Sequence, residues 1–300
     1  MAALLALSFA VCYSVCFAFQ GRLLLVEQSS FGTFQEAARL AILPQGWVSV
    51  IDRGDHSLLV FKEPSASPVT IGGFGWEAGA FDRPSGIATD GINLFVSDYG
   101  NHRIQRFDRN LNFISTLATR DTMESRARFG YPLGVAVSRF GDLFVLDGEN
   151  LRVAKFHVSG RFERSFGDGE RAPARLAAPV SITLSLQDRV LILERDRILE
   201  YDYFGNLVRR LGEGVLKDAI AMAQSDSGFV VVTATSLVLL SPNGAPLQTI
   251  GLGEILTSPD PAKRDGARKP LGEVRDIIVR RQTMWLLTRT ACFVFEMKWR

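Results

Sequence analysis

The sequence predicts an all-β chain that folds as a six-bladed β-propeller of four-stranded antiparallel blades. Short apolar runs separated by turn-forming clusters follow one another along most of the chain. The pattern of runs returns at intervals of roughly 40–55 residues, which is the range of propeller blades. One unpaired apolar run near the N-terminus supplies the strand that the last unit lacks.

The most regular unit spans residues 81–117. It holds four apolar runs, IAT, LFVS, RIQRF and FISTL, separated by the turn-forming clusters TDG, DYGN and DRN. Runs this short fit strands of a small antiparallel sheet, which cannot bury a core alone. Residues 129–166 repeat the pattern, with LFVLD at 143–147 matching LFVSD at 94–98.

Four weaker copies of this unit complete the count of six. Their central runs, such as VLILE and FVVVT, are continuously apolar, as expected for strands that neighbouring blades cover on both faces. Glycine or asparagine in the following turns suits the positive φ of tight hairpins. One anchor residue ends the second run of each unit: Asp52, Asp98, Asp147, Glu194, Thr233 and Thr288.

The two ends of the chain are expected to meet. The last unit stops after FVFEM without a fourth run, while residues 22–28 form an apolar run that belongs to no other unit. We expect residues 22–28 to complete the sixth blade, so that the ring has no open strand edge. Residues 21–300 are therefore predicted to be a single propeller domain.

Residues 1–20 are predicted to be an export signal. Residues 2–19 carry no charge and have the length of a signal-peptide core, although the usual positive N-terminal region is missing. An uncleaved membrane anchor is the main alternative, since the run is close to membrane-spanning length. We expect an exported, periplasmic or extracellular protein that touches a membrane only through residues 2–19, if at all. Cleavage would leave Cys292 alone, which fits an exported protein without internal disulfides.

The composition excludes several classes of function. The 34 Lys and Arg against 32 Asp and Glu give a net charge of +2, which opposes nucleic-acid binding driven by bulk charge. There is no CxxC pair, GxSxG, HExxH or phosphate-binding loop. We therefore predict no catalytic residue, metal ligand or cofactor from a motif.

His56 and His102 occupy equivalent places, four residues after Asp52 and Asp98. Two interpretations are open. The histidines and aspartates bind a divalent ion such as calcium or zinc, or they fix the turn between the second and third strands. The second interpretation is favoured, because Leu151 takes the histidine position in the next unit.

The regular units resemble the NHL repeat. The resemblance lies in F-x-x-P-x-G-I-A at 81–88, LFVSD at 94–98 and NHRIQRF at 101–107. It implies a six-bladed β-propeller. NHL-type relatives include RNA-binding domains, protein-binding sensor domains and enzymes such as the peptide-amidating lyase and lactonase-like propellers. The fold alone therefore does not fix the function.

The predicted site is one mouth of the central channel, where the loops that enter the innermost strands cluster. Alignment of the units on Ser85 predicts a ring of loop residues there, with Arg83 and Asp276 beside it. Arginines at one mouth suit a carboxylate or other acidic group; ordinary solvated loop charges are the alternative. The ring consists of Arg39, Ser85, Leu133, Val180, Asp218 and Arg275.

Two functions of different classes follow. The first is an exported, monomeric propeller that binds a protein or peptide through one face. Three long loops on that face, 118–130, 167–178 and 251–273, support it, and the third is a candidate flap or docking loop. The alternative is a metal-dependent lyase or hydrolase at the channel mouth, with Asp218 and Asp276 holding a divalent ion.

Overall fold

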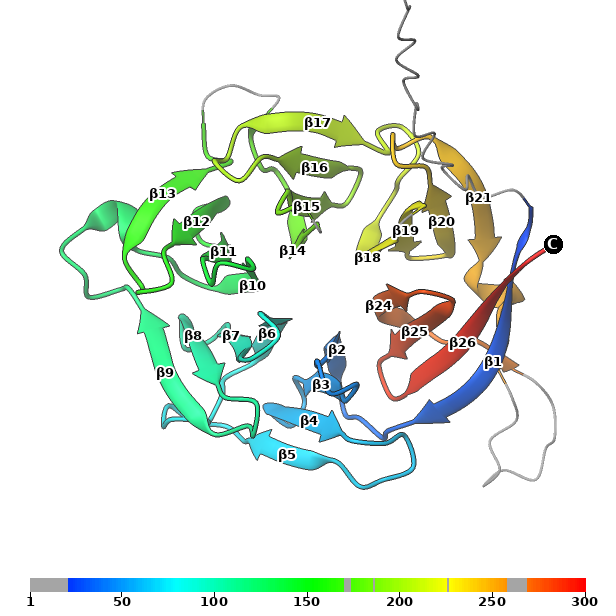
Figure 1. Cartoon of the computed structure of the whole chain (residues 1–300), viewed down its shortest axis with the longest axis horizontal. Helices are drawn as coiled ribbons and strands as arrows, with labels where there is room; N and C mark the ends of the chain where they lie inside the picture. Colours follow the sequence, from blue (N-terminus) through cyan, green and yellow to red (C-terminus); the bar gives the residue numbers. More distant parts are fainter. Residues whose placement is uncertain (1–20, 170–173, 186, 226, 258–268) are drawn as a thin grey trace, which may run out of the picture.

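Six four-stranded antiparallel sheets surround a central channel like the blades of a propeller (Figure 1). The computed structural model describes residues 21–169, 174–185, 187–225, 227–257 and 269–300. The predicted fold is confirmed. The predicted export signal lies outside the described residues, and within them no helix is long and apolar enough to cross a membrane.

The first three blades follow the chain in order, each from its innermost to its outermost strand. Blade 1 holds β2 (Ala37–Ile42), β3 (Val48–Asp52), β4 (Ser57–Phe61) and β5 (Val69–Gly72). Blade 2 holds β6 (Pro84–Thr89), β7 (Leu94–Asp98), β8 (Arg103–Phe107) and β9 (Phe113–Ala118). Blade 3 holds β10 (Pro132–Val137), β11 (Leu143–Asp147), β12 (Arg152–Phe156) and β13 (Phe162–Phe166).

The other three blades complete the ring. Blade 4 holds β14 (Pro179–Leu184), β15 (Val190–Glu194), β16 (Ile198–Tyr201) and β17 (Leu207–Leu211). Blade 5 holds β18 (Ala219–Ser225), β19 (Gly228–Thr233), β20 (Ser236–Leu240) and β21 (Pro246–Gly251). Blade 6 holds β24 (Val274–Arg280), β25 (Thr283–Thr288), β26 (Cys292–Trp299) and β1 (Leu23–Phe31).

The hydrophobic core lies between the blades. Every residue of the second strands β3, β7, β11 and β15 is buried, whereas the outermost strand β9 is almost entirely exposed. Large side chains such as Phe81 and Phe144 are fully buried between neighbouring sheets. The continuous apolar runs of the sequence are therefore the strands covered on both faces.

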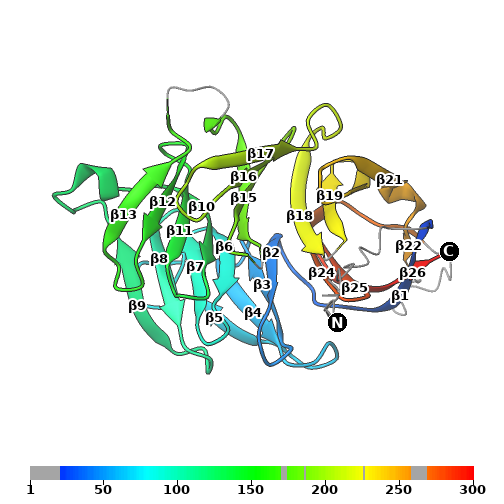
Figure 2. The same ribbon diagram turned by 45° about the horizontal axis from the view of Figure 1, so that its top comes forward.

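The N-terminal strand β1 closes the ring, as predicted, and is longer than expected. Its pairing with β26 runs from Leu23 opposite Trp299 to Phe31 opposite Cys292, with a register shift after Glu27. Leu23 and Phe31 are buried, so the strand contributes to the core as well as covering the edge of β26. Figure 1 and Figure 2 both show β1 and β26 side by side.

The long loops all connect an outermost strand to the innermost strand of the next blade, and therefore share one face. Loop 118–130 contains the short helix η1 (Ser125–Ala127). Loop 251–273 contains η3 (Leu252–Glu254) and a small hairpin of β22 (Leu256–Thr257) and β23 (Lys269–Pro270). Residues 170–173 and 258–268 of these loops lie outside the described residues.

Candidate functional site at the channel mouth

The acidic anchors at the ends of the second strands organise the loops on the channel-mouth face. Oδ1 of Asp98 accepts the backbone N–H of Asp82 (2.7 Å), in the segment that enters β6. The carboxylate of Asp52 accepts the N–H groups of Gln35 and Glu36 in the same way. Asp52 also accepts the N–H of Gly54, and Asp98 accepts a bond from Asn101, so both anchors bond within the turn after the second strand, as predicted. The bonds to the loop entries were not predicted.

Asp98 also holds an arginine that shapes the loop between blades 1 and 2. Nε of Arg103 donates to Asp98 Oδ2 (2.8 Å), and its terminal nitrogens donate to the carbonyls of Trp76, Glu77 and Ala80. Asn101 adds a bond to the carbonyl of Gly75. Loop 73–83 is therefore pinned by buried polar side chains, although its surface is exposed.

The two histidines join neighbouring blades. Nδ1 of His56 accepts the backbone N–H of Arg83 (3.0 Å), and Nδ1 of His102 accepts that of Tyr131 (3.0 Å). Both histidines have the left-handed backbone conformation, with φ of 50° and 53°. Their Nδ1 atoms are thus used as acceptors by the next blade. Leu151 keeps the conformation, with φ of 50°, but has no ring nitrogen to offer.

A hollow of about 520 Å³ opens among these turns. Its walls come from blades 1, 2 and 3. The aromatic and arginine side chains at and around it contact one another. His56 lies against Phe74 (5.1 Å between centroids), Arg83 lies over Tyr99 (5.4 Å), and Tyr99 lies against Tyr131 (5.2 Å). The residues that line the hollow are Glu36, Arg53, His56, Arg83, Tyr99 and Leu133.

The face around this hollow exposes large aromatic side chains. Phe74 is 73% exposed and Trp76, two residues later, is 68% exposed, both in the pinned loop 73–83. Tyr131 is also exposed. We call Arg53, His56, Phe74, Trp76, Arg83, Tyr99 and Tyr131 the aromatic mouth.

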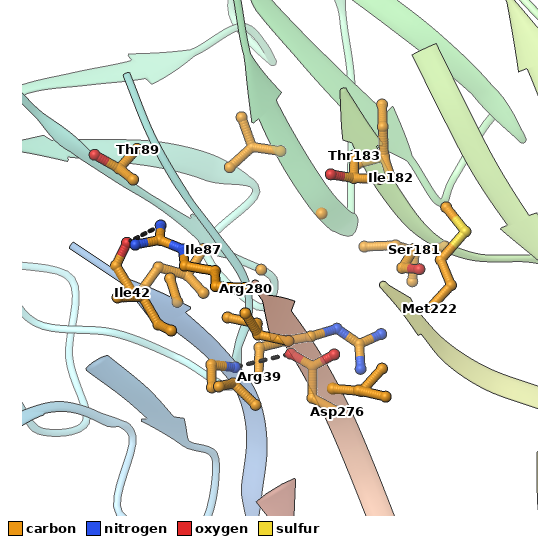
Figure 3. Close-up of a pocket in the computed structure, with 18 residues that line it drawn as sticks. Arg39, Ile42, Ile87, Thr89, Ser181, Ile182, Thr183, Met222, Asp276 and Arg280 are labelled. Atoms are coloured by element: carbon orange, nitrogen blue, oxygen red, sulfur yellow. Dashed lines mark hydrogen bonds between the residues drawn. The ribbon is translucent and has the colours of Figure 1, made fainter. Parts of the chain in front are cut away.

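Arg39 closes the channel beside the aromatic mouth. Its guanidinium crosses from blade 1 and donates to the carbonyls of Val180 in blade 4 (3.1 Å) and Arg275 in blade 6 (3.2 Å). Behind it lies a channel cavity of about 230 Å³ (Figure 3). Asp276 lines this cavity and accepts the backbone N–H of Leu40 (2.8 Å), a contact drawn in Figure 3.

The predicted ring of site residues is only partly brought together. Arg39, Arg275 and Asp276 meet at the channel, and Arg83 lies at the rim of the adjoining hollow. Ser85 is fully buried and donates to the carbonyl of Pro132 (2.5 Å), so it faces the next blade rather than the mouth. The side chain of Asp218 is 70% exposed and lies 3.7 Å from Arg195, away from both hollows.

The strand pairing shows that the alignment on Ser85 was out of register at two positions. Every inner strand has a bulge directly after the residue that pairs with its anchor, and Ser85 occupies this bulge in blade 2. Pro84 pairs with Asp98 and Gly86 with Ser97, which leaves Ser85 as the bulged residue. The same shift makes Ala38, rather than Arg39, the equivalent of Ser85 in blade 1, and Ile220, rather than Asp218, the equivalent in blade 5.

The channel mouth brings arginines and carboxylates together, and Arg83 at its rim lies 3.4 Å from Asp82. Burial lowers the pKa of Arg53, and the positive charges of Arg39 and Arg275 lower it further, against an opposing effect of Glu36. Nε of Arg275 is buried and has no hydrogen-bond partner among the described residues. Burial raises the pKa of Asp276, while Arg39 opposes that rise. Three arginines thus lie near three carboxylates: Glu36 lines the hollow, Asp276 lines the channel cavity, and Glu273 pairs with Arg275 (3.2 Å).

Sequence reasoning missed most of the aromatic mouth. Arg53 and Tyr99 lie in the turns that follow the anchors Asp52 and Asp98, and Phe74 and Trp76 lie in a glycine-rich loop, GGFGWEAGAF. A tryptophan and two phenylalanines in a short glycine-rich loop were the available signal, since such residues are usually buried. The three loops chosen for their length do not contain them.

The described part of the chain contains no group of three or more His, Cys, Asp or Glu side chains that could hold a metal ion. His56 and His102 each use one ring nitrogen to accept a backbone hydrogen bond. These ring contacts join neighbouring blades rather than the turn between the second and third strands, and a divalent ion remains a prediction without a described set of ligands.

Comparison with known proteins supports the resemblance seen in the sequence. The NHL repeat model matches residues 81–107, which are the first three strands of blade 2 and their approach. The Brain tumor protein of Drosophila melanogaster is 31% identical over 147 residues, which are 47% of this chain and 14% of that protein. A probable peptidyl-alpha-hydroxyglycine alpha-amidating lyase of Caenorhabditis elegans is 29% identical over 126 residues, 40% of this chain and 36% of that protein. The chain thus matches less than half the length of either relative.

Solved structures share the architecture at low sequence identity. A streptogramin B lyase superposes with a TM-score of 0.63 at 12% identity, covering 92% of this chain and 98% of its own. Virginiamycin B lyase from Staphylococcus aureus gives 0.61 at 11% identity, covering 92% and 99%. The chain therefore has the architecture of a six-bladed β-propeller. Its blade 2 carries the matched NHL repeat.

Proposed function

We propose that this propeller is a binding module for an acidic protein or peptide segment, and that the aromatic mouth is its docking site. The observation that carries the proposal is a hollow of about 520 Å³ lined by Arg53, Arg83 and Tyr99, with the exposed ring of Phe74 against His56 at its edge. Trp, Tyr and Arg dominate the binding energy of protein interfaces. The match to the Brain tumor protein is compatible with this class of function but does not identify a partner.

The rigidity of the mouth supports this function. Loop 73–83 is fixed by Arg103 and by Gln105, which donates to the carbonyl of Ala80 (2.6 Å) and accepts from Gly79 (2.9 Å). A partner therefore does not have to order the loop that carries Phe74 and Trp76. The cationic groups supply charge complementarity to a carboxylate-rich segment.

Fluorescence anisotropy tests the proposal with two labelled peptides of equal length, one alternating Glu and Tyr and the other alternating Gln and Tyr. We expect the Glu peptide to bind more tightly and to weaken as salt is added, because salt screens exposed charges. The Arg53→Gln/Arg83→Asn variant should bind it about tenfold more weakly. Asn is chosen because Arg83 has a φ of 48°.

Arg109→Gln is the matched control, because Arg109 is exposed in the β8–β9 turn on the opposite face. It should bind the Glu peptide like the unmodified chain. Equal affinity for the two peptides, or full binding by a folded Arg53→Gln/Arg83→Asn variant, would refute the site.

A metal-dependent lyase or hydrolase is the alternative, because two comparisons lead independently to proteins named as lyases. Metal analysis of the purified chain distinguishes it. A bound divalent ion with a rise in melting temperature on adding calcium or zinc would support the lyase or hydrolase. A preparation without bound metal and without that shift would favour the binding module.

Export is a separate proposal that rests on residues 2–19 alone. Fractionation of cells that express the full chain tests it. Recovery in the periplasm, medium or membrane fraction supports export, and recovery in the cytoplasm contradicts it.

A further inference from the structure

The face opposite the aromatic mouth carries a larger hollow, of about 750 Å³. It lies where the inner strands of blades 4, 5 and 6 end, and β26 provides its outer wall. The channel cavity adjoins it, because Thr183, Met222 and Arg280 line both spaces. Figure 3 shows these three side chains around the channel. Its size falls within the range of small-molecule sites.

Apolar side chains from different blades form one part of the wall. Leu184 ends β14, Met222 belongs to β18 and Ile278 belongs to β24, and all three are half-buried. Met297 of β26 adds a buried side chain. Two methionines among these residues suit an apolar ligand of variable shape, because Met side chains adapt easily to their contacts.

Two consecutive arginines form the charged part of the wall. Arg280 ends β24 and donates to the carbonyl of Ile42 in blade 1 (2.8 Å), a bond drawn in Figure 3. Arg281 is exposed in the following turn. No acidic side chain is among the described residues that line the hollow, and neither arginine forms an ion pair with a described residue. Burial lowers the pKa of Arg280, with no carboxylate to oppose this effect.

We propose that this hollow, which we call the distal pocket, binds an amphipathic small molecule with a single carboxylate. The carboxylate would pair with Arg280 and Arg281, and the hydrocarbon would lie against Leu184, Met222 and Ile278. Arginine is suited to this role because its guanidinium stays charged and binds carboxylates through two parallel hydrogen bonds. The polar side chains Gln187, Gln224 and Ser227 line the remaining edge.

The distal pocket is independent of the aromatic mouth, since the two share no lining residue. The aromatic mouth can therefore fail to bind an acidic peptide while the distal pocket binds a small carboxylate. The opposite outcome is equally distinguishable. The apolar wall distinguishes the expected ligand from inorganic anions, which gain nothing from contact with hydrocarbon.

Isothermal titration of the full chain with sodium decanoate tests the proposal, with decanol and inorganic phosphate as comparison ligands. We expect one decanoate per chain and about tenfold weaker binding of decanol, because the alcohol lacks the charge. Arg280→Gln/Arg281→Gln should weaken decanoate binding by about tenfold or more, while Arg280→Lys should lose less. Arg109→Gln should have no effect.

The single variant Arg281→Gln is the control for folding. Arg281 is exposed, so its replacement should leave the melting temperature unchanged. It should still weaken decanoate binding measurably. Absence of saturable decanoate binding by the folded chain would overturn the proposal. Equal affinities for decanoate and decanol, or decanoate binding that both arginine variants retain in full, would also overturn it.

Discussion

Blades 1–3 and blades 4–6 differ in the turn between their second and third strands. In the first half of the ring this turn is longer, and its last residue has the left-handed conformation, as in His56, His102 and Leu151. In the second half the turn is shorter. The long turns are residues 53–56, 99–102 and 148–151, and the short ones are residues 195–197, 234–235 and 289–291.

The longer turn carries side chains that the shorter one lacks. His56 and His102 accept a backbone N–H of the next blade through a ring nitrogen. In the short turns the carbonyls of Arg195 and Arg289 accept the N–H of the next inner strand, 2.9 Å away in both cases. Both kinds of turn therefore join the blades. Only the long turns also supply Arg53 and Tyr99 to the aromatic mouth.

The anchors should show the largest difference around the ring, between the acidic anchors of blades 1–4 and the threonines of blades 5 and 6. Glu194 of blade 4 belongs to the first group, since it accepts loop N–H groups and pairs with Arg197. Asp98→Ala leaves the buried Arg103 without its carboxylate, and we expect it to lower the free energy of unfolding by about 3–5 kcal/mol. Thr233→Ala removes a hydroxyl that bonds only within its own turn, and should cost about 1 kcal/mol. Urea denaturation measures both values.

The Asp98→Asn/Arg103→Met double variant is the control for the buried charge. It should recover part of the stability lost in Asp98→Ala, because no unpaired charge remains. Equal losses for Asp98→Ala and Thr233→Ala would show that the two kinds of anchor do not differ.

Weakening the strand β1 that closes the ring should give the next largest loss of stability. Phe31 is buried against Phe61 (5.0 Å between ring centroids), and Phe31→Ala should lower the free energy of unfolding by about 3 kcal/mol.

The thiol of Cys292, which pairs with Phe31 across β1 and β26, reports on this closure. Burial raises the pKa of Cys292 to about 12, so the native thiol should react very slowly with a thiol reagent. In a chain carrying Cys12→Ser and Cys16→Ser, Phe31→Ala should accelerate labelling of Cys292 about a hundredfold. An unchanged rate would contradict closure by β1.

Removal of a histidine contact should lower the stability by a smaller amount. His102→Leu removes the acceptor for the N–H of Tyr131, and should lower the free energy of unfolding by about 1 kcal/mol. Leu151→Ala, at the same position of blade 3, removes no such bond and serves as the comparison. A thermal melt of both variants checks the difference, and a larger loss for Leu151→Ala would contradict the role of the histidine.

The same contact predicts a weak dependence of stability on pH. Burial and the nearby Arg120 lower the pKa of His102, so the unfolded chain binds a proton more readily than the native one. Stability from this group is fully present above the unfolded pKa of about 6.5 and decreases as the pH falls through that value. The difference in melting temperature between the unmodified chain and His102→Leu should therefore shrink below about pH 6. A difference independent of pH would contradict the lowered pKa.

The blades were predictable because their signals are local. The spacing of the anchors from Asp52 to Thr288 and the continuous apolar runs identify six sheets, and the spare run at 22–28 identifies the closing strand. These features depend only on strand periodicity and on the need to cover sheet edges.

The site was less predictable because it depends on where strands begin and on contacts between blades. The pairing of the inner strands puts Ala38 and Ile220, rather than Arg39 and Asp218, at the position of Ser85. Arg83 was expected at the mouth and lies at its rim, but its neighbours Tyr99 and Tyr131 come from turns of different blades. Such contacts link residues far apart in the sequence and have no local pattern.

Photo-crosslinking tests the central claim that the long turns of blades 1–3 form the docking site. The probe is the alternating Glu and Tyr peptide with one benzophenone side chain, and mass spectrometry locates the attachment points. We expect crosslinks in residues 53–56, 74–83 and 99–102, which high salt and the Arg53→Gln/Arg83→Asn variant reduce. Crosslinks concentrated in the short-turn blades 4–6, or spread evenly around the ring, would contradict the claim.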